Sequence, residues 1–524
     1  MVEVVGMIIR SRDVSKKGVN RLLAVLLLLL SISLCLFSQD SGGWLYIAQA
    51  PAYNTWRPND IVEAKEGGFL VVFWDYQKDS HIQKLSDEGE LMAEMVISAQ
   101  DTITIISRLF VNSDTCNGYI AIALCRPESG NTDAIMVLQF DENLSVLQRK
   151  VVPCIGLIRP VFNLCVLKQD YNFIIAITDG DYSHHLLKLN MAGEILEWKS
   201  IEEDSLSHIC NLFKVVEDTE SFFGMYAQVS IVGAKMGVLV FDDSLQLIRR
   251  AYFDQWENEE EGGYICLSYL YDAINSMMIP LPDSSGYLIS SRFKESLYTS
   301  NFTPIKDDRS TIIAKTDLDF VMQDNYVIVG HLNDTVEVPA FYKSIDCHPN
   351  PMYTKNTYQC TMQGFNNESH WPMALTSLGV VVTKVDEDFN VIWKKRFLTE
   401  KEFYPFAITS IRDGGCAVTG MVYDKNNERR LDLFVFKIDA DGTVGIDEIQ
   451  EESMAFVYPN PAKEIIRIGG MEAKETYVYN TLGQCVMNFR GNEADAQTLS
   501  EGVYLLRITD GNGLIQTLRL VVNK

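Results

Sequence analysis

A short motif before a tight turn recurs seven times along the chain and limits the available folds more than any other feature. It comprises a Lys, Gln or Val, an apolar residue, and a Ser, Asn or Asp whose side chain can hydrogen-bond a nearby backbone N–H and open a turn. The copies are KLSDEGEL (84–91), QFDENLSV (139–146), KLNMAGEI (188–195), VFDDSLQL (240–247), KTDLDFVM (315–322), KVDEDFNV (384–391) and KIDADGTV (437–444).

The sixth position of the motif separates the copies into two groups. It is glycine at Gly89, Gly193 and Gly442, which favours a positive φ there. In the other four copies it is an apolar residue, which predicts turns that close differently, with the apolar side chain packed back on the sheet. These residues are Leu144, Leu245, Phe320 and Phe389.

The spacing of the copies gives the size of the repeating unit. Consecutive copies start 49 to 55 residues apart in four cases and 69 or 75 apart in two. Apolar strands precede each motif, as in GGFLVVFW (67–74) and GGCAVTGM (414–421). About four short antiparallel strands per unit is the size of one β-propeller blade. We therefore expect an all-β propeller of about seven blades over residues 39–444, with six or eight as alternatives and a set of β-sandwiches as the rival fold.

The units also resemble the degenerate propeller repeats of secreted bacterial surface proteins, which read DGGYxxxG and then KxDxxGxxxW. The matching stretches are DGGCAVTG (413–420), KIDADGTV (437–444) and KVDEDFNVIW (384–393), the last with Trp393. This resemblance implies a fold and carries no function with it.

The N-terminal 38 residues have the pattern of a secretory signal peptide. Basic residues up to Arg21 precede the apolar run 22–37, and Ser38 begins a polar stretch. We expect cleavage near Ser38–Gln39. An uncleaved membrane anchor is the alternative, since sixteen apolar residues could nearly span a thinned bilayer.

The repeat stops at Val444, where an acidic linker (445–455) leads into a small all-β segment, 456–524. This segment resembles the type A C-terminal sorting domain of the type IX (Por) secretion system of Gram-negative bacteria. The match comprises a Tyr-Pro-Asn-Pro run, a turn, a Gly-Val-Tyr strand and a closing strand. The residues that carry it are Tyr458, Pro459, Asn460, Pro461, Gly483, Gly502, Tyr504 and Lys524.

The resemblance implies a route and partners. The chain would enter the periplasm through its signal peptide, fold there, and cross the outer membrane through the type IX machinery. A surface sortase-like protease would then cut the linker, and the cargo would be released or attached to lipopolysaccharide. Membrane association would come only through the signal peptide or that attachment.

Composition excludes some functions. The net charge is −25 without basic stripes, which argues against nucleic-acid binding. There is no HExxH pair, nucleophile elbow or Walker loop, so no catalytic, cofactor or metal residues are assigned. His184 and His185 are expected on opposite faces of a strand, and Asp439–Gly442 is expected to form a turn. Most cysteines lie in strands and are expected to be free and buried, whereas Cys347 and Cys360 are candidates for a disulfide.

Two long units point to binding residues. They contain insertions at 254–285 and 329–372, and loops on a rigid scaffold are where binding residues concentrate. Aromatic side chains among polar residues in the second insertion suit a carbohydrate or peptide face, although they could also form a small core over the blades. The candidates are Phe341, Tyr342, Tyr353, Tyr358 and Trp371.

The sequence thus predicts a secreted or surface-attached propeller that binds an extracellular glycan, peptide or protein without catalysis. A hydrolase or lyase with its site at the propeller axis is the alternative, and a purely structural surface module is a third possibility.

Overall fold

The structure is a computed structural model of the whole chain. It describes residues 43–523 except for a set of internal segments. These are 50–56, 76–78, 99–101, 113–117, 128–132, 155–156, 158–162, 204–205, 217–221, 231–233, 254–255, 261–263, 271–275, 300–303, 329–334, 366–376, 399–400, 424–430, 445–449, 512 and 514. The predicted signal peptide lies outside the described residues. Over the described part of the chain, no helix has the length and apolar character to cross a bilayer.

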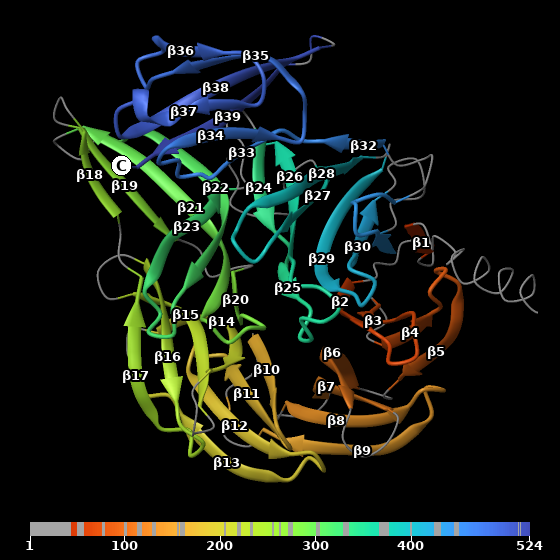
Figure 1. The fold of residues 1–524 in the computed structure, drawn as a ribbon. Helices are drawn as coiled ribbons and strands as arrows, with labels where there is room; N and C mark the ends of the chain where they lie inside the picture. The colour runs from red at the N-terminus through yellow and green to blue at the C-terminus, as the bar shows by residue number, and fades with distance from the viewer. Residues whose placement is uncertain are drawn as a thin grey trace, which may run out of the picture. The chain divides into compact units, whose positions relative to one another are not determined.

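Seven antiparallel sheets make up the part of the chain that carries the repeat (Figure 1). The first four sheets have four strands each, in chain order from the inner to the outer strand. Blade 1 comprises β2 (Arg57–Glu63), β3 (Phe69–Trp74), β4 (Ser80–Leu85) and β5 (Leu91–Ile97), and blade 2 comprises β6 (Thr102–Asn112), β7 (Gly118–Pro127), β8 (Ala134–Asp141) and β9 (Val146–Pro153). Blade 3 comprises β10 (Asn163–Gln169), β11 (Asn172–Thr178), β12 (His184–Asn190) and β13 (Ile195–Ser200). Blade 4 comprises β14 (Leu206–Lys214), β15 (Phe223–Ser230), β16 (Ala234–Phe241) and β17 (Leu247–Tyr252).

Blades 5 and 6 are larger because the insertions predicted there form strands. Blade 5 comprises β18 (Trp256–Glu260), β19 (Tyr264–Leu270), β20 (Met277–Pro280), β21 (Tyr287–Thr299), β22 (Pro304–Thr316) and β23 (Met322–Ile328). Blade 6 comprises β24 (Thr335–Pro339), β25 (Ile345–Cys347), β26 (Thr357–Phe365), β27 (Ser377–Val385), β28 (Val391–Leu398) and β32 (Gln450–Ser453). In both blades two short strands share one long neighbour, since β19 and β20 both pair β21 and β24 and β25 both pair β26. The insertions are therefore largely sheet rather than loop.

The last blade is closed by the other end of the chain. Its strands are β29 (Glu402–Ser410), β30 (Cys416–Tyr423) and β31 (Leu431–Ile438), and its outer strand is β1 (Trp44–Ala48). Trp44 lies opposite Lys437, as Trp393 lies opposite Lys384 in blade 6. The Nε1–H of each Trp donates to a carbonyl in the motif turn of the next blade, Asp87 at 2.7 Å and Ala440 at 3.0 Å. The N-terminal strand thus completes the seventh copy of the repeat.

Contacts between the inner strands show that the blades form a closed ring. Each inner strand contacts the next, in the order β2, β6, β10, β14, β20, β25, β29 and back to β2. Seven apolar clusters lie between successive blades, one for each interface. Burial of strand faces between blades is what makes a ring of blades stable where a single sheet would not be. The predicted seven-bladed all-β fold is confirmed.

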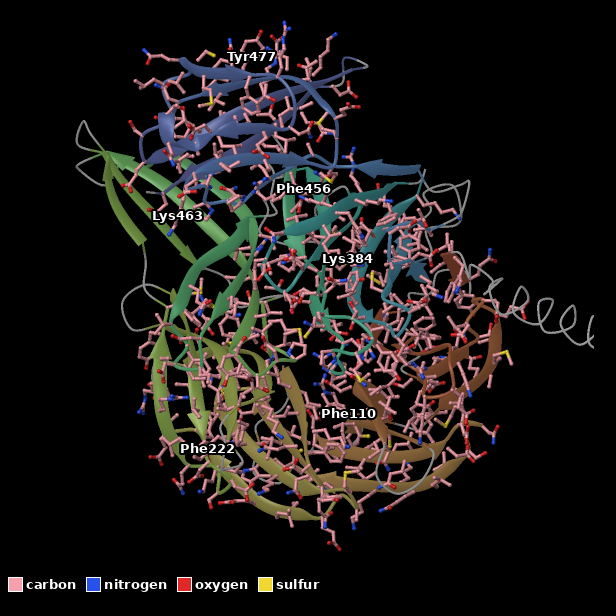
Figure 2. All side chains as sticks on the ribbon, viewed as in Figure 1. Phe110, Phe222, Lys384, Phe456, Lys463 and Tyr477 are labelled. Atoms are coloured by element: carbon pink, nitrogen blue, oxygen red, sulfur yellow. The ribbon has the colours of Figure 1, made fainter. Side chains whose placement is uncertain are left out.

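In four of the seven motifs the first residue links its blade to the next. Lys84, Lys188 and Lys384 donate from Nζ to the backbone oxygens of Glu142, Asp243 and Ala440, all at the fourth position of the following motif. The Gln139 amide does the same with Met191. Figure 2 shows Lys384 among the side chains of the last blades. This contact explains why a long donor side chain recurs at that position.

All seven motif turns close in the same way, so the expectation of two turn types is wrong. In the glycine copy Gly89 has φ +83° and donates to the Ser86 carbonyl, and in an apolar copy Leu144 has φ +60° and donates to the Asp141 carbonyl. The apolar side chains are nevertheless buried, as expected. Burial therefore offsets the cost of left-handed backbone at Leu144, Leu245, Phe320 and Phe389.

Substitution of Phe320 tests this compensation. The ring stacks on Tyr287 at 4.9 Å and φ is +64°, so Phe320→Ala loses the packing and keeps the strain. We expect both Phe320→Ala and Phe320→Gly to lower the free energy of unfolding by about 2–5 kcal/mol. The glycine variant should be the more stable by about 1 kcal/mol, because only glycine adopts this φ freely. The measurement is chemical denaturation.

Phe241 supplies the matched control for that pair. It is a buried strand residue stacked on Phe223 at 5.3 Å, and its φ is not positive. There the order should reverse, with Phe241→Gly less stable than Phe241→Ala by about 0.5–1 kcal/mol. The same order at both sites would contradict the explanation.

Two further sheets follow the propeller. One comprises β33 (Phe456–Tyr458), β34 (Ile465–Gly469) and β37 (Glu493–Asp495), and the other β36 (Cys485–Phe489), β35 (Ala473–Tyr479), β38 (Gly502–Asp510) and β39 (Ile515–Val522). A short 3-10 helix, η2 (Ala496–Thr498), connects β37 to β38. Residues from both sheets form one apolar core that includes Val457, Ile466, Val478, Leu506 and Leu520.

Candidate functional site

The Tyr-Pro-Asn-Pro run is tied to the last strand of the chain. The buried side chain of Asn460 donates from Nδ2 to the Arg519 carbonyl at 3.1 Å and accepts the Val521 N–H at Oδ1 at 2.8 Å. Ala462 continues the contact, because its N–H donates to the Val521 carbonyl and its carbonyl accepts the Asn523 N–H. One amide side chain therefore fixes the register between the start and the end of this domain.

The other motif residues have structural roles that can be read from their contacts. Gly483, at φ +75°, closes a turn opened by the Asn480 side chain. The hydroxyl of Tyr504 donates to the Ser500 carbonyl at 2.8 Å, while its ring lies in the core. Gly502, at φ +150°, begins β38. Lys524 lies outside the described residues.

The second candidate site is the inserted segment of blade 6, where residues 340–344 interrupt the inner strand between β24 and β25. Phe341 stacks on Phe406 at 4.6 Å, and the Tyr342 N–H donates to the Phe406 carbonyl of β29. The Tyr342 carbonyl accepts from Arg108 of β6 at 3.2 Å, which joins blade 6 to blade 2 across the ring. The Tyr342 side chain is 48% exposed.

The loop between β25 and β26 carries exposed apolar side chains on a fixed backbone. Met352 is 90% exposed and Tyr353 is 50% exposed. Asn350 holds the loop, since its Oδ1 accepts the Met352 N–H and its carbonyl accepts the Tyr353 N–H. The His348 ring packs edge-on against Tyr353 at 5.0 Å and accepts the Asn350 N–H. The loop is thus preorganised, and Met352 is a candidate that the aromatic pattern of the sequence did not indicate.

One of the five predicted binding residues is not part of this surface. Tyr358 is a core residue of β26, fully buried, with its hydroxyl donating to the Gly414 carbonyl and burial raising its pKa. The strand pairing explains this, since alternate residues of a central strand face the next blade, as Tyr358 does. Trp371 lies outside the described residues.

The predicted Cys347–Cys360 disulfide is not formed, and both thiols are free. In the register of β25 and β26, Cys347 lies opposite Thr357 rather than Cys360. Cys347 donates to the Pro280 carbonyl at 3.8 Å, and Cys360 is buried between blades 6 and 7. Burial raises the pKa of the Cys347 thiol to about 12, so neither side chain is arranged for oxidation.

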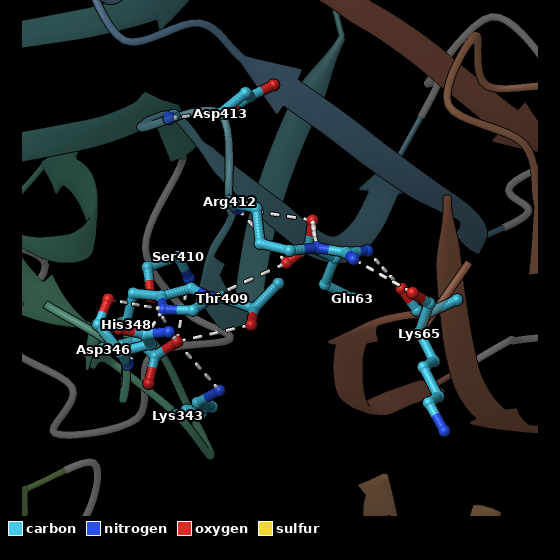
Figure 3. A network of polar contacts seen from close by, with 12 residues as sticks. Glu63, Lys65, Lys343, Asp346, His348, Thr409, Ser410, Arg412 and Asp413 are labelled. Atoms are coloured by element: carbon cyan, nitrogen blue, oxygen red, sulfur yellow. Dashed lines mark hydrogen bonds and ion pairs between the residues drawn. The ribbon is translucent and has the colours of Figure 1, made fainter. Parts of the chain in front are cut away.

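A polar network connects blades 6, 7 and 1 beside the loop between β25 and β26 (Figure 3). Arg412 donates from Nε to Glu63 at 2.9 Å and from its terminal nitrogens to the carbonyls of Ala64 and Lys65. Asp346 accepts from the Ser410 N–H at 2.8 Å and lies 3.3 Å from Lys343 Nζ. His348 Nε2 lies 3.9 Å from Glu63.

The hydrogen bonds and ion pairs of these side chains mostly join one blade to another. Arg412 and Glu63 link blade 7 to blade 1, and Asp346 links blade 6 to blade 7, as Figure 3 shows. In the described part of the chain, no group of three His, Cys, Asp or Glu side chains is placed to hold a metal ion. His184 and His185 have separate partners, Thr178 and the Leu206 carbonyl for the first and Asp179 and Ser200 for the second. The 439–442 segment forms the expected turn.

A comparison with protein families decides the nature of the C-terminal domain. Residues 456–523 match the family described as "Secretion system C-terminal sorting domain". The chain carries a secretion sorting domain. The protein is therefore exported to the cell surface or secreted, and its sorting domain interacts with the type IX secretion machinery, as the sequence predicted.

No characterised protein matches the chain by sequence. Among solved structures, hydrazine synthase of Kuenenia stuttgartiensis matches with 9% identity and a TM-score of 0.41, over 69% of this chain and 92% of that one. The WD40 domain of SCAP from fission yeast matches with 8% identity and a TM-score of 0.33, over 76% and 98%. The ring of seven blades rests on the strand pairing of the chain itself.

The Asn460 contacts predict that substitution of this residue destabilises the sorting domain and reduces export. Asn460→Ala leaves the partly buried Val521 N–H and Arg519 carbonyl without their partner, which should cost about 1–3 kcal/mol of domain stability. We expect a several-fold lower amount of surface or secreted protein, measured by fractionation of expressing cells. Asn488→Ala, at an exposed position of β36, is the control and should leave export unchanged. Equal export of both variants would show that this contact is not needed.

Proposed function

We propose that the exported propeller is a non-enzymatic binding module for a glycan, peptide or protein outside the cell. The observation that carries the proposal is the blade 6 loop, in which Met352 and Tyr353 are exposed on a backbone held by Asn350 and His348. An exposed aromatic ring and a flexible thioether on a preorganised loop are suited to contact an apolar sugar or peptide face, with little ordering cost on binding.

The route proposed from the sequence supplies the rest of the function. Residues 1–38 would act as the signal peptide and 39–444 as the cargo. The acidic linker 445–455 would be cut by the sortase-like protease of the pathway, and residues 456–524 would be removed. Release or attachment to lipopolysaccharide would follow.

An enzyme acting at the propeller axis is the alternative function. The contacts of the inner strands argue for binding instead. Arg108 lies 3.5 Å from Asp60 and donates to the Tyr342 carbonyl, and Asp60 accepts the Leu109 N–H. These charged groups near the axis are therefore engaged in holding blades 1, 2 and 6 together, whereas a catalytic site needs groups that face a substrate.

The test uses the full-length protein and an array of bacterial and plant oligosaccharides and mucin-derived peptides. We expect at least one probe to bind and Met352→Ala/Tyr353→Ala to weaken that binding tenfold or more, because aromatic anchors dominate such surfaces. Tyr171→Ala/Tyr182→Ala is the matched control, since both residues are exposed but lie on blade 3. Binding that survives the loop variant would contradict the assignment. Release of reducing ends or cleaved peptide would establish the enzyme alternative.

A further inference from the structure

The outer strand of blade 6 is paired on its outer side, unlike those of the other blades. Among the described strands, β5, β9, β13, β17, β23 and β1 each end their sheet, whereas β28 is followed by β32. The pairing is antiparallel and runs from Leu398 opposite Gln450 to Lys395 opposite Ser453. The Met454 N–H then donates to the Lys394 carbonyl at 3.0 Å. Residues 450–454 of the linker therefore follow the outer edge of the blade.

An apolar side chain, Phe456, anchors the chain just after this strand pair. Phe456 is 8% exposed and belongs to the cluster between blades 5 and 6, together with Val385, Phe389 and Val391. Gly469 makes room for the ring, because a Cβ there would lie 2.2 Å from it. A ladder of main-chain hydrogen bonds with a side-chain anchor at one end is how folded domains bind extended peptides at a sheet edge.

The charges of the two strands are complementary. β28 contains Lys395 and Arg396, next to the buried Lys394 that pairs with Glu337, in a chain with 70 acidic and only 45 basic residues. The linker carries Asp447, Glu448, Glu451 and Glu452. In the register of the pair, Glu452 lies opposite Arg396. Opposite charges at facing positions of neighbouring strands stabilise the pairing.

We propose that the outer edge of β28 is a strand-addition site for an acidic, extended peptide and that residues 450–453 are its resident occupant. The site is separate from the blade 6 loop, so the proposal does not depend on the proposed function.

Proline at position 452 provides the test. Because Lys394 and Met454 form a hydrogen-bonded pair, alternation along the ladder places the Glu452 N–H toward β28. Glu452→Pro removes that donor and should release the linker from the edge. We expect a labelled peptide of sequence GIDEIQEESMAF (445–456) to bind the full-length Glu452→Pro protein at least tenfold more tightly than wild type, measured by fluorescence anisotropy.

Charge-reversal variants test whether the peptide binds at the β28 edge rather than at the outer strand of another blade. Adding Lys395→Glu and Arg396→Glu to the proline variant should abolish peptide binding. Arg149→Glu/Lys150→Glu in the same background should not, since these residues lie on the open outer strand of blade 2. A peptide with lysine at its four acidic positions should not bind. Failure of the proline variant to bind, or equal binding by wild type, would overturn the proposal.

Hydrogen exchange on the wild-type protein tests the resident strand without any substitution. The amides of Glu452 and Met454 should exchange at least a hundredfold more slowly than in the isolated peptide, because the Met454 N–H donates to β28 and the register places the Glu452 N–H toward the same strand. Exchange at the rate of the free peptide would show that the linker does not occupy this edge and would equally overturn the proposal.

Discussion

Glu337→Ala is expected to lower the free energy of unfolding by about 3–5 kcal/mol, which is among the largest effects of any single substitution in this protein. Glu337 and Lys394 form an ion pair of 2.7 Å in which the side chains are 0% and 5% exposed. Removing the carboxylate leaves the ammonium group of Lys394 buried without its counter-charge. Chemical denaturation of the full-length variant measures the loss.

The environment of the pair explains why it is tolerated. Thr361 of β26 donates to Glu337 Oε2 at 3.3 Å, and Thr311 of β22 donates to the Glu337 carbonyl at 2.8 Å. The pair therefore spans blade 6 from its inner strand to its outer strand and contacts blade 5. Burial raises the pKa of Glu337, with Lys394 opposing that effect, so the pair is held at a desolvation cost.

Two further variants test whether Glu337→Ala loses stability through the unpaired charge of Lys394 or through lost packing. Replacing both residues, in Glu337→Met/Lys394→Met, should recover most of the stability, because an apolar pair of similar volume carries no desolvation cost. Glu387→Ala breaks the exposed Lys355–Glu387 pair, which is 2.9 Å long, and should change nothing measurable. A double variant as unstable as Glu337→Ala would contradict the argument from charge.

Trp44→Ala is the second substitution with a large expected effect, because it weakens the closure of the ring. The indole lies in the cluster between blades 7 and 1, packs edge-on against Phe69 at 5.6 Å, and donates to the Asp87 carbonyl. We expect a loss of about 3–5 kcal/mol. Trp44→Phe keeps most of the apolar contact and should lose only about 1 kcal/mol for the hydrogen bond.

Gly89 offers an independent check on the same contact. A Cβ at this position would lie 2.6 Å from the Trp44 ring, and φ is +83°. Gly89→Ala should therefore destabilise wild type, and it should cost less in the Trp44→Ala background, where the ring is absent. Additive effects of the two substitutions would show that the ring does not occupy this position. Both measurements use thermal or chemical denaturation.

The repeat allowed the fold to be predicted because each motif residue acts locally. An Asp or Asn at the third position opens a turn through its own backbone neighbours, and the strands around it are apolar runs bounded by turn residues, buried on both faces. The sorting domain was predictable for a different reason. Its Tyr-Pro-Asn-Pro run and final strand contact each other through Asn460, so their order and spacing are linked.

The features that the sequence did not predict depend on contacts between distant residues. Phe320 could not be recognised as left-handed, because the energy that offsets its strain comes from Tyr287 and Phe213 in other strands. Tyr358 resembled a loop aromatic only because the length of blade 6 hid the position of β26. The pairing of Glu337 with Lys394 joins residues 57 positions apart, and no local pattern predicts it.

The position of Trp44 has a consequence for the order of folding. This residue is among the first of the propeller to be synthesised, yet its strand partner Lys437 is among the last. Blades 1 to 6 can form as they emerge, but the seventh must pair its last strand with one made long before, at a sequence separation of 393 residues. We therefore expect closure to be a late, long-range step of folding. Until it occurs, β31 presents an unpaired edge to any other chain nearby.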